Sequence, residues 1–307
     1  MKWAEIIAQV RDRLQEQSEA FFSDDRLMDS ARRVQAEIAA ATECIETMDE
    51  MDVSAGCIEC PLPEDCLNII SATFDGRPLM QVDTRRLDYK VYPSGTPSMY
   101  YIFGSNIGLY PSVSAVKKLK LWYSQRPPLG AFSLSHSGAG GASAATIAVT
   151  GGSITMTVTG GTYTGTDSID TTATGTNTIG GVSAAINALG KGWTALKQPG
   201  CRAVEPAPGI EETVAKSAFQ KQLTVDLAVK LPEEFQQLIE LGVIYRAMWK
   251  DTEFEAGEVY KREYLERLNA MRRVFWRRRT RSQNRTVRDA YGAGAAAHEA
   301  GIRVYIP

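Results

Sequence analysis

The chain has 307 residues, of which 44% are hydrophobic and 23% charged, and these proportions exclude a wholly disordered chain, a collagen-like rod and a coiled-coil rod. It contains no run of about 20 apolar residues, and its first ten residues lack the order of a secretory signal, so we expect no membrane partner. With 34 Lys and Arg against 36 Asp and Glu, the net charge is −2, which excludes a uniformly basic nucleic-acid-binding protein.

The small net charge hides two segments of opposite sign. Residues 34–76 carry ten acidic side chains and no Lys or Arg, whereas residues 272–288 carry eight arginines and no acid. Within the acidic segment, the spacing of Glu46, Asp49, Glu50 and Asp52 lacks the glycine and the final glutamate of a calcium loop, so we interpret this run as a solvated or partner-facing edge. The segregation predicts surfaces that pair with partners of opposite charge, including neighbouring copies of the same chain.

Residues 2–40 have the pattern of two helices, in which apolar side chains recur at helical spacing. Ser23, Asp24 and Asp25 mark the start of the second helix, because serine and acidic residues favour the positive end. From residue 44 to about 124 the apolar period changes to two and turn signals become frequent, which predicts a β-region. The predicted strands in this region are residues 67–74, 79–82, 98–103, 107–110 and 117–123.

The composition changes sharply between residues 131 and 190, where 42 of 60 residues are Gly, Ala, Ser or Thr. Such a segment is either a flexible linker or a small module. Strict alternation over residues 154–159, a second strand over 162–166, a helical stripe up to Leu189 and a strand from Trp193 favour the module. We therefore predict an inserted β-β-α-β module with its linkers over residues 129–210.

The C-terminal third begins with a strand-like stretch, residues 222–229, and continues as a helical hairpin. Pro232 followed by two glutamates opens the first helix, since proline is favoured at the first helical position. A second amphipathic helix runs to about residue 276. The tail from Arg277 is arginine-bearing, then rich in Gly and Ala, and it ends in a short apolar strand, residues 302–306.

The sequence contains little that indicates a catalytic site or a metal site. Five cysteines, an odd number, exclude a complete disulfide framework and favour a reducing compartment. Cys57, Cys60 and Cys66 have metal-like spacing, but a fourth ligand is missing and both histidines, His136 and His298, are distant in flexible-looking sequence. No nucleophile has a positioned base. We predict packed thiols, no metal, no cofactor and no enzyme.

The arginine-rich segment is the one chemically distinctive feature, and three interpretations compete for it. It is a solvated helix end, a contact for nucleic-acid phosphates, or a segment that docks on an acidic protein surface. The apolar strand that follows favours the third interpretation. The predicted binding residues are Arg277, Arg278, Arg279, Arg281, Arg285, Arg288, Ile302, Val304, Tyr305 and Ile306.

Several motifs, in this order, resemble the head-to-tail adaptor (connector) proteins of tailed bacteriophages, especially short-tailed ones. The first is FSDDRLM at residues 22–28. The β-region contributes LPED at 62–65, DGRPL at 75–79, YPSGTP at 92–97, IGLYP at 107–111 and LKLWY at 119–123, with PP at 127–128. The hairpin contributes LPEEF at 231–235 and YRAMWKD at 245–251. The resemblance covers residues 1–128 and 222–280, and the inserted module departs from the family pattern.

The resemblance implies a structural virion protein that forms a ring of about twelve copies between the portal protein and the tail. Such a ring extends the DNA channel, through which genomic DNA passes without sequence-specific binding, and offers a platform for a tail or nozzle protein and for tail fibres. It also implies that the C-terminal arm binds the portal, and that the protein is assembled in the host cytoplasm and resides in the neck or tail of the virion.

We therefore predict an α+β fold, a helical bundle of about four helices from both chain ends with a β-region, an inserted small β-rich module and an extended C-terminal arm. The predicted divisions are residues 1–128, 129–210, 211–276 and 277–307. One alternative is a tail-tube, neck or completion protein of the same particle. The other is a nucleic-acid-binding protein that uses the arginine-rich helix end.

Overall fold

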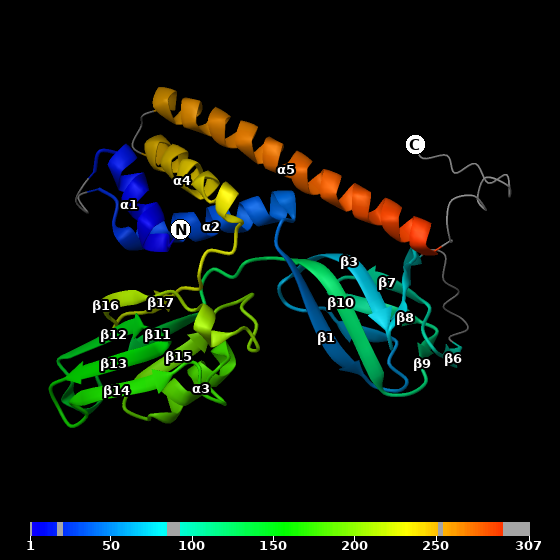
Figure 1. Cartoon of the computed structure of the whole chain (residues 1–307). Coiled ribbons are helices and arrows are strands. Elements are labelled where there is room, and N and C mark those ends of the chain that lie inside the picture. The colour runs from blue at the N-terminus through cyan, green and yellow to red at the C-terminus, as the bar shows by residue number, and fades with distance from the viewer. Residues whose placement is uncertain (1, 17–20, 85–92, 251–253, 291–307) are drawn as a thin grey trace.

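The computed structural model describes residues 2–16, 21–84, 93–250 and 254–290, with side chains up to residue 276. Within these ranges five α-helices and 17 strands surround three hydrophobic clusters (Figure 1). We name the three clusters, with the elements around them, the helical layer (α1, α2, α4 and α5), the β-region (β1–β10) and the module cluster (β11–β17 with α3). Residues 251–253, which connect the two helices of the predicted hairpin, lie outside the described residues.

The predicted fold class is wrong in its balance of helix and sheet. About 35% of the structure is strand, so the fold is mostly β with mixed α and β elements, not a helical bundle with a small β-rich module. Two causes are identifiable. The acidic residues 46–53 and the Ser-rich residues 132–136 form strands that their composition concealed, and the module cluster has seven strands and a hydrophobic core of its own.

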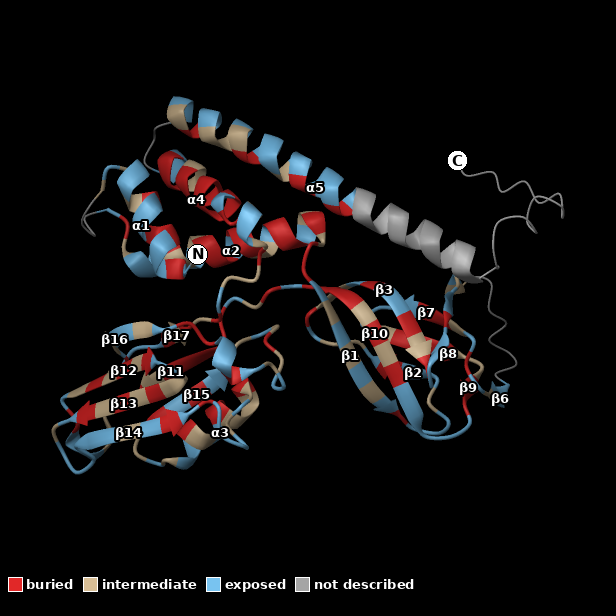
Figure 2. Cartoon of the chain, in the orientation of Figure 1, coloured by how far each residue is buried: buried red, intermediate tan, exposed pale blue. Residues whose placement is uncertain are grey.

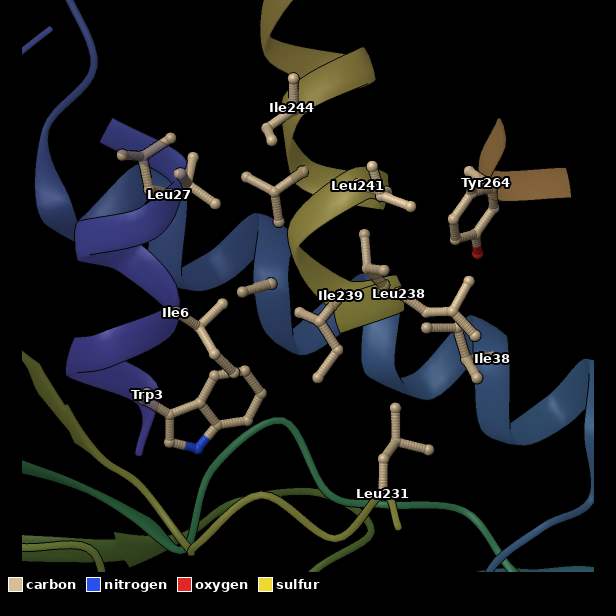
Figure 3. Packing of buried hydrophobic residues seen from close by; sticks show 14 of the residues in the cluster. Trp3, Ile6, Leu27, Ile38, Leu231, Leu238, Ile239, Leu241, Ile244 and Tyr264 are labelled. Carbon is tan, nitrogen blue, oxygen red and sulfur yellow. The ribbon is translucent and has the colours of Figure 1, made fainter. Parts of the chain in front are cut away.

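The helical layer joins the two ends of the chain. Its members are α1 (Trp3–Arg13), α2 (Asp24–Thr42), α4 (Gln237–Lys250) and α5 (Phe254–Ala290). Helix α4 contacts the other three, and Figure 2 shows it buried on most of its surface while α1 and α5 expose their outer faces. In Figure 3, Ile6, Ile38 and Ile239 point into the shared core. Gly242 allows the close approach of α4 to α2, because a Cβ there would lie 2.5 Å from Val34 Cγ1.

The β-region is built on two four-stranded sheets and one two-stranded sheet. The first sheet has the order β1-β10-β3-β4, antiparallel throughout, with β1 (Glu46–Val53), β10 (Lys117–Gln125), β3 (Cys66–Phe74) and β4 (Arg77–Pro78). The second has the order β2-β8-β7-β5, with β2 (Glu59–Pro61), β8 (Asn106–Tyr110), β7 (Met99–Phe103) and β5 (Met80–Gln81). The remaining pair is β6 (Ser94–Gly95) with β9 (Ser112–Val113).

Alternation along β10 explains how the first sheet packs. Leu119, Leu121 and Tyr123 are fully buried on one face, whereas Lys118 is exposed and Trp122 half-buried on the other. Successive side chains of a strand point to opposite faces, so the alternation places one face of the sheet on the core and leaves the other accessible.

The module cluster contains two sheets and one helix. Its sheets have the orders β15-β11-β17 and β14-β13-β12-β16. The strands are β11 (Phe132–His136), β12 (Ala144–Thr150), β13 (Ser153–Thr159), β14 (Gly165–Asp170), β15 (Trp193–Lys197), β16 (Thr213–Ser217) and β17 (Leu223–Val225), and the helix is α3 (Ile179–Ala188). Thr178 caps α3 by accepting a hydrogen bond from Gly181 N. Strands β16 and β17 thus return the chain through the module's own sheets before it enters α4.

Candidate interaction surfaces

The predicted binding residues lie at and beyond the end of the described side chains. Six of them lie in the last part of α5, where the structure describes the backbone but not the side chains: Arg277, Arg278, Arg279, Arg281, Arg285 and Arg288. Ile302, Val304, Tyr305 and Ile306 also lie outside the described residues. Their predicted role therefore stays a prediction.

The last described turns of α5 have two distinct faces. Met271 and Phe275 are buried in the helical layer, whereas Arg272 and Arg273 are exposed and Trp276 is 69% exposed. Asn269 joins the three exposed side chains around a shallow hollow of about 350 Å³. This face combines guanidinium groups with an aromatic ring, a combination that suits contact with carboxylates or with another aromatic surface.

The acidic segment is used largely inside the chain. Five of its ten acidic side chains form ion pairs with cations of other elements: Glu37 with Arg246, Asp49 with Arg202, Glu50 with Lys118 and Lys120, Glu64 with Lys197, and Asp75 with Lys117. The lysines of β10 account for part of this, because β1 lies beside β10 in the sheet. The surface over residues 34–76 is therefore far less acidic than the sequence alone suggested.

An open hollow of about 430 Å³ lies on the accessible face of the first sheet. Met48 and Trp122 belong to its walls, and so does Ile70, which is 37% exposed. The polar wall residues are Glu46, Thr47 and Ser71. Large apolar side chains on an open sheet face are typical of sites that contact another molecule, and β1 forms one edge of this sheet.

A buried polar network joins the β-region to the module cluster. Asp65 is fully buried and accepts hydrogen bonds from Tyr123 Oη (3.0 Å) and Gln125 Nε2 (2.7 Å). Arg202, from the segment after β15, donates to Tyr123 Oη (3.3 Å) and forms an ion pair with Asp49 (2.6 Å). Burial, with the nearby Asp65 charge, raises the pKa of Tyr123 well above its usual range, so the phenol stays protonated.

A second junction ties α1 to the module cluster through Glu211. Trp3 N donates to Glu211 Oε1 (2.7 Å) and Trp3 Nε1 donates to the Leu227 carbonyl (2.8 Å). Beside them Lys2 pairs with Glu212 (2.7 Å) at a hollow of about 300 Å³. Glu211 Oε2 is buried and has no hydrogen-bond partner in the described part of the chain. Burial raises the pKa of Glu211 to about 7.

The cysteines do not assemble a three-ligand set. Among the described residues no group of three or more His, Cys, Asp or Glu side chains is arranged to hold a metal ion. Cys57 and Cys60 lie together, with 2.9 Å between their Sγ atoms. Burial raises the pKa of Cys60 to about 12 and that of Cys66 to about 11, so both are neutral thiols near pH 7.

His136 is a packed residue and does not lie in a flexible segment as the sequence suggested. It is fully buried in β11, where Nδ1 accepts from Gly138 N (3.0 Å) and Nε2 lies 2.9 Å from the Lys191 carbonyl. Because Nδ1 accepts a hydrogen bond, Nε2 is the ring nitrogen placed to donate to the Lys191 carbonyl. His298 lies outside the described residues.

The junction residues were missed by sequence reasoning. Asp49 and Arg202 are 153 positions apart, and Trp3 and Glu211 are 208 positions apart. No local motif signals such pairs, because they depend on how the three clusters are placed. The low charge of the module, whose only charged residues between 131 and 190 are Asp167 and Asp170, offers no signal either.

Together, the fold and these surfaces define a mostly β protein with α-helices, whose three hydrophobic clusters are linked by polar junctions. Residues 1–149 match the model of the family described as SU10 adaptor protein. The match confirms the resemblance to phage head-to-tail adaptor proteins that the sequence motifs predicted. It covers α1, α2, the β-region and the beginning of the module cluster, whereas residues 222–280, which also carried the resemblance, lie beyond it.

Among the curated proteins none matches this chain. No helix within the described ranges is long and apolar enough to cross a membrane.

Proposed function

We propose that this protein is a structural component of a tailed-phage virion that acts as the head-to-tail adaptor and not as an enzyme. The single observation that carries the proposal is the family match over residues 1–149. In this role it forms a ring of about twelve copies between portal and tail, as closed cyclic symmetry allows. The ring extends the channel for genomic DNA and presents a platform to a tail or nozzle protein and to fibres. The virion neck is its proposed location.

The described surfaces support contact between copies. The hollow at Met48, Ile70 and Trp122 is open and apolar, and the α5 face at Arg272 and Trp276 is basic and aromatic. Surfaces of this kind bury apolar area on assembly, and each copy in a ring needs two different faces for its two neighbours. We propose that these two faces take part in ring contacts.

The C-terminal arm, residues 277–307, is the proposed portal-binding element. The six arginines between residues 277 and 288 suit carboxylates on the portal, and the apolar strand at residues 302–306 suits burial there. One arm binds modestly, whereas a ring of arms that engage together binds tightly. We propose that the inserted module lies outside the ring contacts and offers the site for fibres or other tail proteins. The divisions at 128, 210 and 276 are part of the same proposal.

The test is native mass spectrometry of the purified chain, alone and mixed with the portal ring encoded by the same phage genome. We expect a complex with about one adaptor copy for each portal subunit. A chain ended after residue 276 is expected to fold but to lose the complex. Unchanged binding by the shortened chain contradicts the role of the arm, and no association of the full chain with the portal contradicts the adaptor role.

Two alternatives remain distinguishable by experiment. A tail-tube, neck or completion protein of the same particle forms a ring without binding the portal. A nucleic-acid-binding protein that uses residues 272–288 binds DNA with an affinity that falls steeply with salt, because each phosphate contact releases counterions. The adaptor differs from the first alternative because it binds the portal, and from the second because DNA binding is not its main property.

A further inference from the structure

Cys57 and Cys60 bring their sulfur atoms into direct contact. Their Sγ atoms lie 2.9 Å apart, which is within about 1 Å of the length of a disulfide bond. All five cysteines are free thiols, and no sulfur–sulfur contact joins Cys44, Cys66 or Cys201 to another cysteine in the described structure.

The backbone on both sides of the pair is held in place. Gly56 N donates to the Val113 carbonyl (2.7 Å) and Val113 N donates to the Cys57 carbonyl (3.3 Å). Cys60 lies in β2 and pairs with Ile107 of β8. Both cysteines are thus anchored to neighbouring strands, so a bond between them requires only a small adjustment of the side chains.

The two thiols differ in accessibility in a way that fits stepwise oxidation. Cys57 is partly exposed, whereas Cys60 is buried with 6% of its surface exposed. Exchange with a disulfide oxidant requires an accessible thiol for the first attack and a close thiol for the second. Cys57 fits the first role and Cys60 fits the second.

We propose that Cys57 and Cys60 are a modification site at which an intramolecular disulfide forms when the protein meets an oxidising medium. With oxidised glutathione, the Cys57 thiolate attacks one sulfur, forms a mixed disulfide and releases one glutathione thiolate. The neighbouring Cys60 thiol then loses its proton as its sulfur attacks the Cys57 sulfur and releases the second glutathione. The two cysteine protons end on the two glutathione molecules, so one disulfide is exchanged for another.

The proposed setting of this reaction rests on the proposed function. A virion protein is assembled in a reducing cytoplasm, where thiols persist, and reaches an oxidising medium after lysis. The bond ties Cys57, in the loop between β1 and β2, to Cys60 in β2. It therefore fixes a turn of the β-region after assembly is complete.

The test counts free thiols in the purified full-length chain before and after incubation with oxidised glutathione. Maleimide labelling under denaturing conditions followed by intact mass is expected to find five thiols before and three after, from the five cysteines of the chain. The variant C57S is expected to keep four thiols after oxidation, whereas C60S is expected to trap the mixed disulfide at Cys57 and to show three thiols and the mass of one bound glutathione. The matched control C66S is expected to fall from four thiols to two.

Peptide mapping identifies the bonded pair. Trypsin leaves Cys44, Cys57, Cys60 and Cys66 in one peptide, because residues 34–76 contain no Lys or Arg. A protease that cleaves after glutamate separates Cys57 from Cys60 at Glu59, so the two peptides stay joined until a reductant is added. Five thiols after oxidation, a different bonded pair, or loss of two thiols in C57S overturns the proposal.

The outcome is separable from that of the adaptor role. Thiol counts on the isolated chain test the pair whether or not the chain binds a portal. Purified particles test whether oxidation follows lysis, with an alkylating reagent present from the start of denaturation. Oxidised Cys57 in particles, together with reduced Cys57 in the host cytoplasm, supports this setting. Reduced Cys57 in particles contradicts it.

Discussion

Glu211 provides a sharp test of how the helical layer is attached to the module cluster. Its carboxyl group accepts a hydrogen bond from Trp3 N at the start of α1, while Oε2 is buried without a partner in the described structure. We expect Glu211→Gln to keep the acceptor for Trp3 N and to remove a buried charge. The adjoining hollow of about 300 Å³ leaves the new amide group room to meet water.

The magnitude follows from the pKa of Glu211, which is about 7 in the folded chain against 4.5 for an unperturbed glutamate. Because the folded pKa is raised, the folded chain binds more protons than the unfolded chain between pH 4.5 and 7. The stabilisation that comes from proton binding by Glu211 is therefore fully present below pH 4.5, and it is lost as the pH rises through 7. The difference amounts to about 3 kcal/mol at most.

The assay is urea unfolding of the wild type and of Glu211→Gln at a series of pH values from 5 to 8. We expect the variant to gain stability relative to the wild type as the pH rises, and to be more stable by up to about 3 kcal/mol at pH 8. Glu212→Gln, which alters an exposed neighbour, is the control and is expected to follow the wild type. A variant that is less stable at pH 8 refutes the reasoning, because the charge then contributes more at the start of α1 than its burial costs.

Three further predictions concern other contacts. Asp226→Ala removes one of the two carboxylates that pair with buried Arg32, which keeps its ion pair with Asp29, and urea unfolding is expected to show a loss of about 1–3 kcal/mol; a loss below about 1 kcal/mol contradicts this. Gly108→Ala places a Cβ 2.0 Å from the Tyr101 ring, and thermal unfolding is expected to show a loss of about 1–3 kcal/mol; an unchanged unfolding temperature contradicts this. Met48→Glu puts a charge into the open hollow on the first sheet, and native mass spectrometry is expected to show a folded chain that assembles less on the portal; unchanged assembly removes this face from the ring contacts.

Elements with strong periodicity were predictable from the sequence. The strand predicted at residues 117–123 is observed as Lys117–Gln125, and the helical stripe ending at Leu189 is observed as α3, Ile179–Ala188. Strand β1 was missed because four of its eight residues are acidic and it was interpreted only through its charge. Its acidic side chains are tolerated because β1 lies at a sheet edge beside the lysines of β10.

The second strand of the module shows a different reason for error. Residues 162–166 were predicted, whereas β14 spans Gly165–Asp170. Thr and Gly carry little information about register, since neither marks a buried face clearly. Strand pairing with β13 decides the boundaries, and that pairing is a property of the folded sheet.

The polar junctions explain why the arrangement of the three clusters is specific although the sequence signals none of it. Apolar contact is non-directional, so apolar surfaces alone allow several orientations of one cluster on another. An ion pair such as Arg32 with Asp226 loses its benefit when it is displaced, because the Arg32 guanidinium stays buried with one partner fewer. Arg202, which pairs with Asp49 and donates to Tyr123 Oη, acts in the same way between the module cluster and the β-region. These junctions therefore select one orientation of the module cluster, which is what a protein that presents fixed faces to several partners requires.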